Sequence, residues 1–266
     1  MISKLPRGLK RQIRIIGCRL VAAWRRYPRN ARKLLLNYEE TDQLASPFLN
    51  WETFLNWETS ITPIPRRGTI EIQKNRVHNL ERAISLINNR LILPGQAFSL
   101  SQHLGEPTIE NGFQSGPVFV GGKVLADAGG GLCLIATNLY SLFLKSGCQI
   151  LERHNHSIDA YGNERFYELG QDAAIAYAYK DLAIRNNFKT PLLLEIGMIG
   201  DTVQSRLSAA LQKPVEVIVR SHVLQRIPPA IQDQHPGWHI CTTRYARKEN
   251  ACWRQDYVSF SHYMPC

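Results

Sequence analysis

The sequence GGGLCLIATNLYSLFLKSG, residues 129–147, decides the expected fold. Three glycines precede Cys133, which opens an apolar segment of helical length. Glycine permits backbone angles that a side chain forbids, so the run suits a sharp turn into a helix. A thiol in the first helical turn lies near unpaired N–H groups and the positive end of the helix dipole, which lower its pKa. The stretch therefore predicts a helix that ends at Gly147 and carries a nucleophilic cysteine at its start.

Two short segments further along the chain supply partners for this thiol. ERHNHS contains His154 and His156, and GQDAA contains Asp172. We expect Cys133 to be the nucleophile, His156 the base on or just before a strand, and Asp172 the group that orients the imidazole, with Asp159 as a competitor for that last role. Cysteine, histidine, aspartate is the chain order of the papain and transglutaminase class of thiol enzymes.

The backbone around the cysteine is the expected oxyanion or substrate-binding site. We expect these contacts at Gly130, Gly131, Leu132 and Leu134, whose N–H groups surround the start of the helix. The alternative interpretation is that GGGLC is a tight structural turn with a buried thiol. The helix would then contribute only apolar packing to the core.

The positive charge of the chain is confined to one end. The 266 residues carry a formal net charge of +10, but residues 1–38 contain eleven lysines and arginines and no acid, so the other 228 residues sum to −1. Residues 9–27 place Leu9, Ile16 and Trp24 on one stripe of a helix with arginines around it. This pattern predicts a basic amphipathic arm that contacts an anionic membrane, or one that packs on the protein body. No nucleic-acid motif follows the arm, so nucleic acid is not an expected partner.

The arm does not have the pattern of an export signal. Its apolar runs are interrupted by Arg14, Arg19 and Arg25, and no stretch reaches the roughly 18 apolar residues of a membrane span. The six cysteines are therefore expected to be reduced thiols in the cytoplasm. We expect a cytoplasmic protein, in peripheral contact with the inner face of the membrane through the arm.

The remaining patterns predict an α+β fold, with a few helices on a mostly antiparallel sheet. We expect an N-terminal appendage at 1–66 and one domain at 67–266, with a possible papain- or transglutaminase-like core. A helix is expected at 75–87. The expected strands are 97–99, 149–153, 173–180, 182–186, 215–224 and 257–263, with hairpins at 117–126 and 192–209.

No metal or cofactor site is predicted. His154 and His156 would share a face of a strand, but this spacing is not diagnostic of zinc. Histidines and cysteines also gather in the tail without any CxxC pair, and the glycine run lacks the GK[ST] ending of a phosphate loop. The tail residues in question are His235, His239, Cys241, His262 and Cys266.

The ordered motifs of the chain resemble the VanW family, which is known from a vancomycin-resistance gene cluster and from many bacterial genomes. The matching pieces are NRVHNL, LPGQAFSL, LGEPTIENGFQSG, GGGLC, ERHNHSID and GQDAAIAYAYKDL, which begin at residues 75, 93, 104, 129, 152 and 170.

The resemblance implies a bacterial accessory protein linked to the cell envelope or to the glycopeptide response. Together with the residues above, it suggests a thiol acyltransferase or hydrolase that acts on an amide or peptide, such as a peptidoglycan precursor. The alternative is a non-catalytic binding module for an envelope precursor or a partner protein. One departure bears on activity, because the family usually has glutamine after the cysteine and this chain has Leu134.

Overall fold

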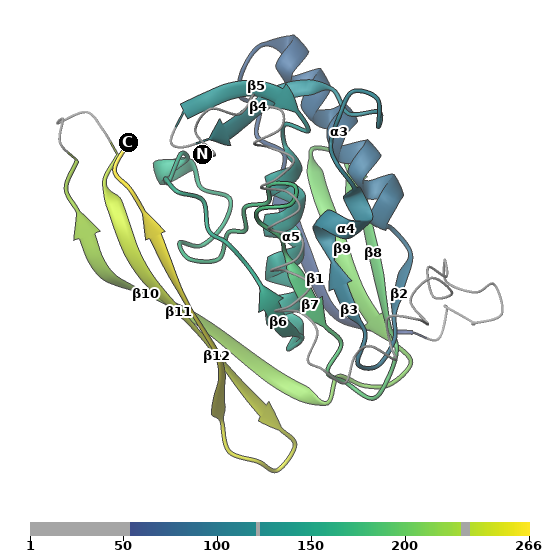
Figure 1. Ribbon diagram of the computed structural model, residues 1–266. Helices are drawn as coiled ribbons and strands as arrows, with labels where there is room; N and C mark the ends of the chain where they lie inside the picture. Colours follow the sequence, from purple (N-terminus) through teal and green to yellow (C-terminus); the bar gives the residue numbers. More distant parts are fainter. Residues whose placement is uncertain (1–53, 121–122, 230–234) are drawn as a thin grey trace, which may run out of the picture.

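The computed structural model describes residues 54–120, 123–229 and 235–266. Side chains are described for all of these residues except those within 117–127. The structure confirms the α+β class, because antiparallel sheets dominate and few helices accompany them (Figure 1). The basic arm expected at 9–27 lies outside the described residues. Within them, no helix is both long and apolar enough to cross a membrane.

The largest sheet has four antiparallel strands. The hairpin predicted at 192–209 is confirmed and forms its two central strands. Trp57 of the edge strand β1 (Leu55–Pro63) is buried, and its indole N–H donates to the carbonyl of Leu211 at 2.7 Å. This strand falls within the appendage expected at 1–66, and it pairs with β9 (Thr202–Ala209) of this sheet. In spatial order the strands are β1 (Leu55–Pro63), β9 (Thr202–Ala209), β8 (Leu192–Ile199) and β2 (Arg90–Ile92).

Two helices, α3 (Ile70–Ile87) and α5 (Leu132–Ser146), pack against this sheet (Figure 1). The helix predicted from residue 75 begins five residues earlier, because the side chain of Thr69 caps it by accepting from Ile72 N–H. Helix α5 spans the predicted range and ends at Gly147 with φ +86°. Asn138 joins it to the sheet by donating to Thr62 Oγ1 at 2.9 Å.

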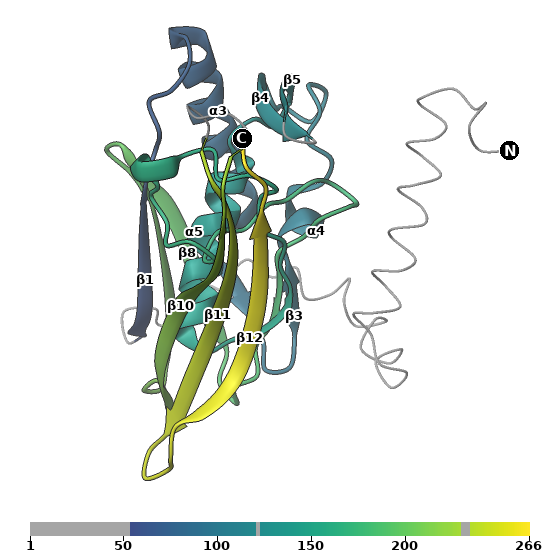
Figure 2. The same ribbon diagram turned by 90° about the vertical axis from the view of Figure 1, so that its left-hand side faces the viewer.

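A second sheet covers the opposite side of α5, and Figure 2 shows it in front of the helix. Its antiparallel strands are β10 (Val215–Ile227), β11 (Gly237–Lys248) and β12 (Arg254–Tyr263). The sequence analysis predicted β10 and β12 with shorter bounds and missed β11. Because sheets lie on both sides of α5, nearly all of its side chains are buried. This explains why its sequence is apolar around most of its circumference.

Smaller elements complete the fold. The strands expected at 97–99, 149–153 and 182–186 form a three-stranded antiparallel sheet, and the hairpin expected at 117–126 is confirmed. The prediction of a strand at 173–180 is wrong. The backbone of this segment bonds to side chains and loops instead of a neighbouring strand, as when Ala173 N–H donates to Thr137 Oγ1. The elements are β3 (Ala97–Ser99), α4 (Leu100–Leu104), β4 (Ser115–Val120), β5 (Lys123–Ala128), β6 (Gln149–Glu152), the 3-10 turn η4 (Gly162–Glu164) and β7 (Ala183–Arg185).

Candidate functional site

Cys133 lies in the first turn of α5, as the sequence predicted. Gly131 precedes the helix with φ +102°, and a Cβ there would stand 2.8 Å from Cγ of Arg76. Only glycine tolerates both conditions. Cys133 is half-buried as a residue, and its sulfur approaches the carbonyl oxygen of Ile175 at 3.7 Å. The glycine run therefore fixes the position of the thiol at the start of the helix.

His156 lies between the thiol and a carboxylate. Its Nδ1 is 2.5 Å from Oδ2 of Asp172, and its backbone N–H donates to the same oxygen at 2.8 Å. The pKa of the Cys133 thiol is lowered by the side chain and charge of His156, and Nε2 is the ring nitrogen not engaged by Asp172. The three residues singled out by the sequence therefore act on one another at the start of α5.

Neither partner stands on a strand, contrary to the expectation. His156 lies in the loop that follows β6, and Asp172 lies in the irregular segment before Ile175. This segment runs beside α5, where the hydroxyl of Thr137 bonds the backbone of Ala173. Side-chain bonds to the helix thus take the place of a sheet in holding the carboxylate.

The protonation states of the site depend on these contacts. Burial raises the pKa of the Cys133 thiol, but the hydrogen bond and charge of His156 outweigh it, so the pKa lies below its usual value. Burial likewise lowers the pKa of His156, but Asp172 and Cys133 reverse this and raise it to about 10. His156 is therefore an imidazolium near neutral pH, and its charge favours the thiolate form of Cys133 in a pair of coupled groups.

Asp172 is fully buried and accepts four hydrogen bonds. Besides the two from His156, its Oδ1 accepts from Arg153 Nη2 at 2.8 Å and from the hydroxyl of Tyr263 at 2.5 Å. Burial raises its pKa, but the hydrogen bond and charge of His156, followed by the charge of Arg153, hold it well below the usual range. The sequence analysis missed Arg153 and Tyr263. Arg153 belongs to the quoted ERHNHS motif and could have been found there, whereas nothing local marks Tyr263.

The competing residues have other partners. Asp159 is buried and accepts from Arg165 Nε at 2.9 Å and from Gly162 N–H at 3.2 Å. His154 Nε2 lies 3.1 Å from Oε1 of Glu152. Of the two carboxylates considered for orienting the imidazole, Asp172 is therefore the one that contacts it.

The expected oxyanion donors are only partly available. The N–H of Leu132 donates to Gly129 O at 3.3 Å, and that of Leu134 donates to Gly131 O at 2.9 Å. Both leucine side chains are buried in the core. Within the described part of the chain, the N–H of Cys133 itself has no acceptor. The free donor nearest the sulfur is thus the N–H of Cys133 itself. Cys133 N–H was not named among the expected oxyanion donors.

The histidines and cysteines of the tail are spread along the second sheet. His239 and His262 are cross-strand neighbours whose rings pack edge to face with centroids 4.1 Å apart. His235 and Cys266 bond each other through their backbones. Over residues 54–120, 123–229 and 235–266, no group of three or more histidines, cysteines or acids is placed to hold a metal ion.

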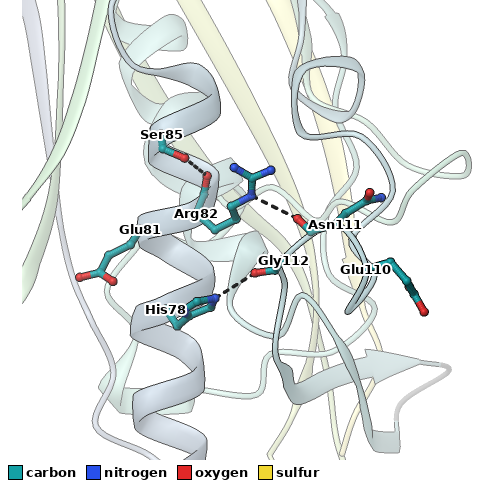
Figure 3. A pocket seen from close by; sticks show the side chains of 7 residues that line it. All are labelled: His78, Glu81, Arg82, Ser85, Glu110, Asn111 and Gly112. Atoms are coloured by element: carbon teal, nitrogen blue, oxygen red, sulfur yellow. Dashed lines mark hydrogen bonds between the residues drawn. The ribbon is translucent and has the colours of Figure 1, made fainter.

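A pocket lies between α3 and the loop that follows α4 (Figure 3). Across its floor His78 Nε2 lies 2.9 Å from the carbonyl oxygen of Gly112, and Arg82 Nε donates to the carbonyl of Asn111 at 3.2 Å. Cys133, His156 and Asp172 are not among its lining residues. The lining residues are His78, Glu81, Arg82, Ser85, Glu110, Asn111 and Gly112.

Two curated proteins are similar to parts of this chain. The uncharacterized protein YoaR of Bacillus subtilis is 26% identical over 154 residues, which is 54% of this chain and 50% of YoaR. The vancomycin B-type resistance protein VanW of Enterococcus faecalis is 30% identical over 116 residues, 43% of this chain and 42% of that protein. The chain thus spans half the length or less of these relatives. No solved structure matches it.

The sequence model of the VanW-like protein family matches residues 75–208. This range contains Cys133, His156 and Asp172 but ends before β10. The match covers half of the chain and agrees with the motifs quoted above. The chain therefore belongs to the VanW-like protein family.

Proposed function

We propose that this protein is a thiol enzyme that cleaves or transfers an acyl group at an amide or peptide bond. The observation that carries the proposal is the placement of His156, which bonds Asp172 through Nδ1 at 2.5 Å and lowers the pKa of the Cys133 thiol. A histidine oriented by a carboxylate and bonded to a thiol is the arrangement that activates a sulfur nucleophile.

The chemistry follows from the placement of the proton. The thiolate of Cys133 attacks the carbonyl carbon, and the oxygen gains a negative charge that the N–H of Cys133 stabilises. The imidazolium of His156 donates its proton to the departing amine as the C–N bond breaks, which leaves a thioester. Neutral His156 then takes a proton from water or from a second amine as it attacks the thioester, and the released thiolate completes the cycle.

The likeness to the papain and transglutaminase class rests on these side chains. In this chain, as in that class, the cysteine lies at the start of a helix, and the histidine and then the aspartate follow it along the chain. The loops that carry His156 and Asp172 take the place of the strands of that class. We propose a related core on this ground alone.

The expected substrate is a peptide of the cell envelope, for example a peptidoglycan precursor. This part of the proposal is supported by the similarity to a protein named for vancomycin resistance. We also propose that residues 9–27 place the enzyme on an anionic membrane at its cytoplasmic face. That location would bring the active thiol to lipid-linked envelope precursors.

A binding module remains the second candidate function. The pocket between α3 and the loop after α4 favours it, because its lining is polar and excludes the thiol and its partners. In this role the pocket would recognise an envelope precursor or a partner protein, and Cys133 would be structural.

One experiment separates the two functions. The full chain is treated with iodoacetamide at pH 7, and labelling of each cysteine is followed by peptide mass spectrometry. The enzyme requires fast labelling of Cys133 that slows in the His156→Ala variant. Incubation with envelope peptides should also give a hydroxylamine-sensitive acyl adduct on Cys133. Labelling of Cys133 that requires unfolding would instead establish a structural cysteine and favour the binding module.

A further inference from the structure

We propose that Arg153, held in place by strand β12, is a positioning residue that makes the thiolate the electroneutral state of the buried site. The inference rests on the proposed function, because it concerns how Cys133 is kept reactive. It adds a residue outside the Cys133–His156–Asp172 chain and extends the site to a strand that the family match does not reach.

The contacts of Arg153 fix its guanidinium against Asp172. Nη2 donates to Oδ1 of Asp172 at 2.8 Å, and Nε donates to the backbone carbonyl of the same residue at 2.6 Å. Nη2 also donates to Gly170 O at 3.0 Å. Both side chains are almost excluded from solvent, with 3% of Arg153 and none of Asp172 exposed.

Strand β12 supplies the other half of this arrangement. Arg153 Nη1 donates to Ser261 Oγ at 2.7 Å, and the hydroxyl of Tyr263 donates to Oδ1 of Asp172 at 2.5 Å. The hydroxyl of Tyr263 also accepts from Gly170 N–H at 3.0 Å. The end of β12 therefore holds both the arginine and the free oxygen of the carboxylate.

Counting charges shows what Arg153 does for the thiol. Asp172 is an anion beside a histidine whose proton makes it a cation. If these were the only charges, a thiolate at Cys133 would leave the buried cluster with one excess negative charge. Such a charge is costly away from water. With Arg153 present, two cations face two anions when Cys133 is ionised. Protonation of the sulfur then leaves an excess positive charge instead.

The other titratable groups around the cluster are tyrosines and two arginines. Arg76 of α3 packs against Gly131, and Arg76 and Arg67 both face Tyr161. Their guanidiniums donate to the backbone carbonyls of Pro65, Arg67 and Ala160 rather than to Asp172. Tyr140 of α5 lies under the guanidinium, with Arg153 5.0 Å from its ring centroid, and its hydroxyl is 3.3 Å from that of Tyr257 on β12. Tyr161 and Tyr167 approach from the segment between His156 and Asp172. Burial raises the pKa of Tyr140, Tyr161, Tyr167 and Tyr263, which keeps them neutral at neutral pH. Among these cations, Arg153 is therefore the one that pairs with the carboxylate of the cluster.

The test is the pH profile of Cys133 alkylation by iodoacetamide in the full chain, measured between pH 4 and 11. The acid limb reports ionisation of the thiol, and the basic limb reports loss of the histidine proton. In Arg153→Met both limbs should move to higher pH, the acid limb by about 1–3 units, because a neighbouring charge has been removed. Arg153→Lys keeps the charge and should therefore show little of this shift, with both limbs close to their wild-type positions.

A purely structural role would give a different profile. Loosening of the His156–Asp172 contact moves the acid limb to higher pH and the basic limb to lower pH. The pH range between the two limbs therefore narrows. We expect this narrowing, by about 0.5–1 unit, in Tyr263→Phe, which removes one hydrogen bond and no charge. Tyr257→Phe removes a hydroxyl from the same strand without touching Asp172 and should leave the profile unchanged.

Arg244→Met is the matched control for the loss of a buried arginine. Arg244 also joins the second sheet to α5 and is 3% exposed, but it pairs with Asp256. It should destabilise the fold without moving either limb. An unchanged profile in Arg153→Met, or an equal shift in Arg244→Met, would overturn the inference. If Arg153→Met does not fold, the expected result is a nearly wild-type profile in Arg153→Lys and the narrowed profile in Tyr263→Phe. A wild-type profile in Tyr263→Phe would also overturn it. Failure of the proposed function would appear separately, as slow wild-type labelling that is insensitive to His156→Ala.

Discussion

The two ends of helix α5 carry the same kinds of residue and differ in one partner. At the N-terminal end Cys133 lies near an arginine–aspartate pair, Arg153 and Asp172. At the C-terminal end Cys148 lies near another such pair, formed by Arg244 with Asp256. Arg244 donates to the carbonyl of Cys148 at 2.8 Å. Burial raises the pKa of the Cys148 thiol to about 12, whereas the pKa of Cys133 lies below its usual value.

The difference shows what lowers the pKa of a cysteine in this fold. Burial disfavours the thiolate at both ends, and an arginine close by is insufficient to reverse it at Cys148. Only Cys133 has a histidine in contact with it, and only that histidine is bonded by a carboxylate. The histidine, rather than the general electrostatic surroundings, therefore separates the thiol whose pKa is lowered from the thiol whose pKa is raised.

The largest effect on stability is expected from Asp172→Asn. The substitution leaves Arg153 buried without a counter-charge, and breaking a buried ion pair in this way costs about 3–5 kcal/mol. The matched change Asp256→Asn should cost less, because 35% of that carboxylate is exposed. Urea unfolding of both variants measures the difference. Equal losses would show that the two pairs are equivalent and would remove the asymmetry between the helix ends.

The largest effect on reactivity is expected from His156→Ala. Without its partner the Cys133 thiol should return to a pKa near 9 or above, so the thiolate fraction at pH 7 falls to about 1% and alkylation slows roughly 100-fold. Labelling of Cys148 should not change. The neighbouring His154→Ala serves as the control, since His154 bonds Glu152 instead. A similar slowing in both histidine variants would contradict the assignment of His156.

The two glycines that flank α5 allow the two ends of the helix to be compared through their backbone conformation. Gly131 has φ +102° and Gly147 has φ +86°, and an added Cβ would meet Arg76 Cγ at 2.8 Å or Val215 Cγ2 at 2.9 Å. Each change to alanine should cost about 1–3 kcal/mol of unfolding free energy, because both positions are strained for a side chain. Only Gly131→Ala should also slow Cys133 alkylation, since it displaces the start of the helix. If Gly147→Ala slowed it equally, the effect would be general loosening.

The smallest expected effect is on the pH dependence of stability. The ordinary pKa is 9.0 for the thiol and 6.5 for histidine; folding lowers the pKa of the thiol and raises that of His156 to about 10. The lowered thiol pKa makes stability rise with pH up to pH 9, and the raised histidine pKa makes stability fall with pH from 6.5 to about 10. The two slopes cancel where they overlap, so a net loss of stability remains between pH 9 and about 10.

This pH dependence is measured as a difference in unfolding free energy. The wild type is compared with the double variant Cys133→Ala and His156→Ala by urea unfolding from pH 5 to 10. A difference that falls between pH 9 and 10 supports a pair that keeps its proton up to about pH 10. A difference that stays constant from pH 5 to 10 would contradict the raised pKa of His156.

Local sequence predicted the elements that depend on local chemistry. The glycine run, the apolar segment and Gly147 correctly predicted helix α5, and alternating residues predicted β10 and the β8–β9 hairpin. It failed where distant contacts decide the outcome. Strand β1 needs β9 to be recognised as part of the body, and the segment after Asp172 is held by Thr137 instead of a neighbouring strand.

The sequence by itself determined the family and the three residues that converge at the start of α5, because each lies in a motif with a chemical reason for its residue types. Only the tertiary structure decided that Asp172 rather than Asp159 contacts His156, and that Arg153 and Tyr263 hold the carboxylate. The physical reason is that a hydrogen bond depends on geometry over a few ångströms. Tyr263 and Asp172 are 91 residues apart in the chain, and only the packing of the second sheet on α5 brings them together.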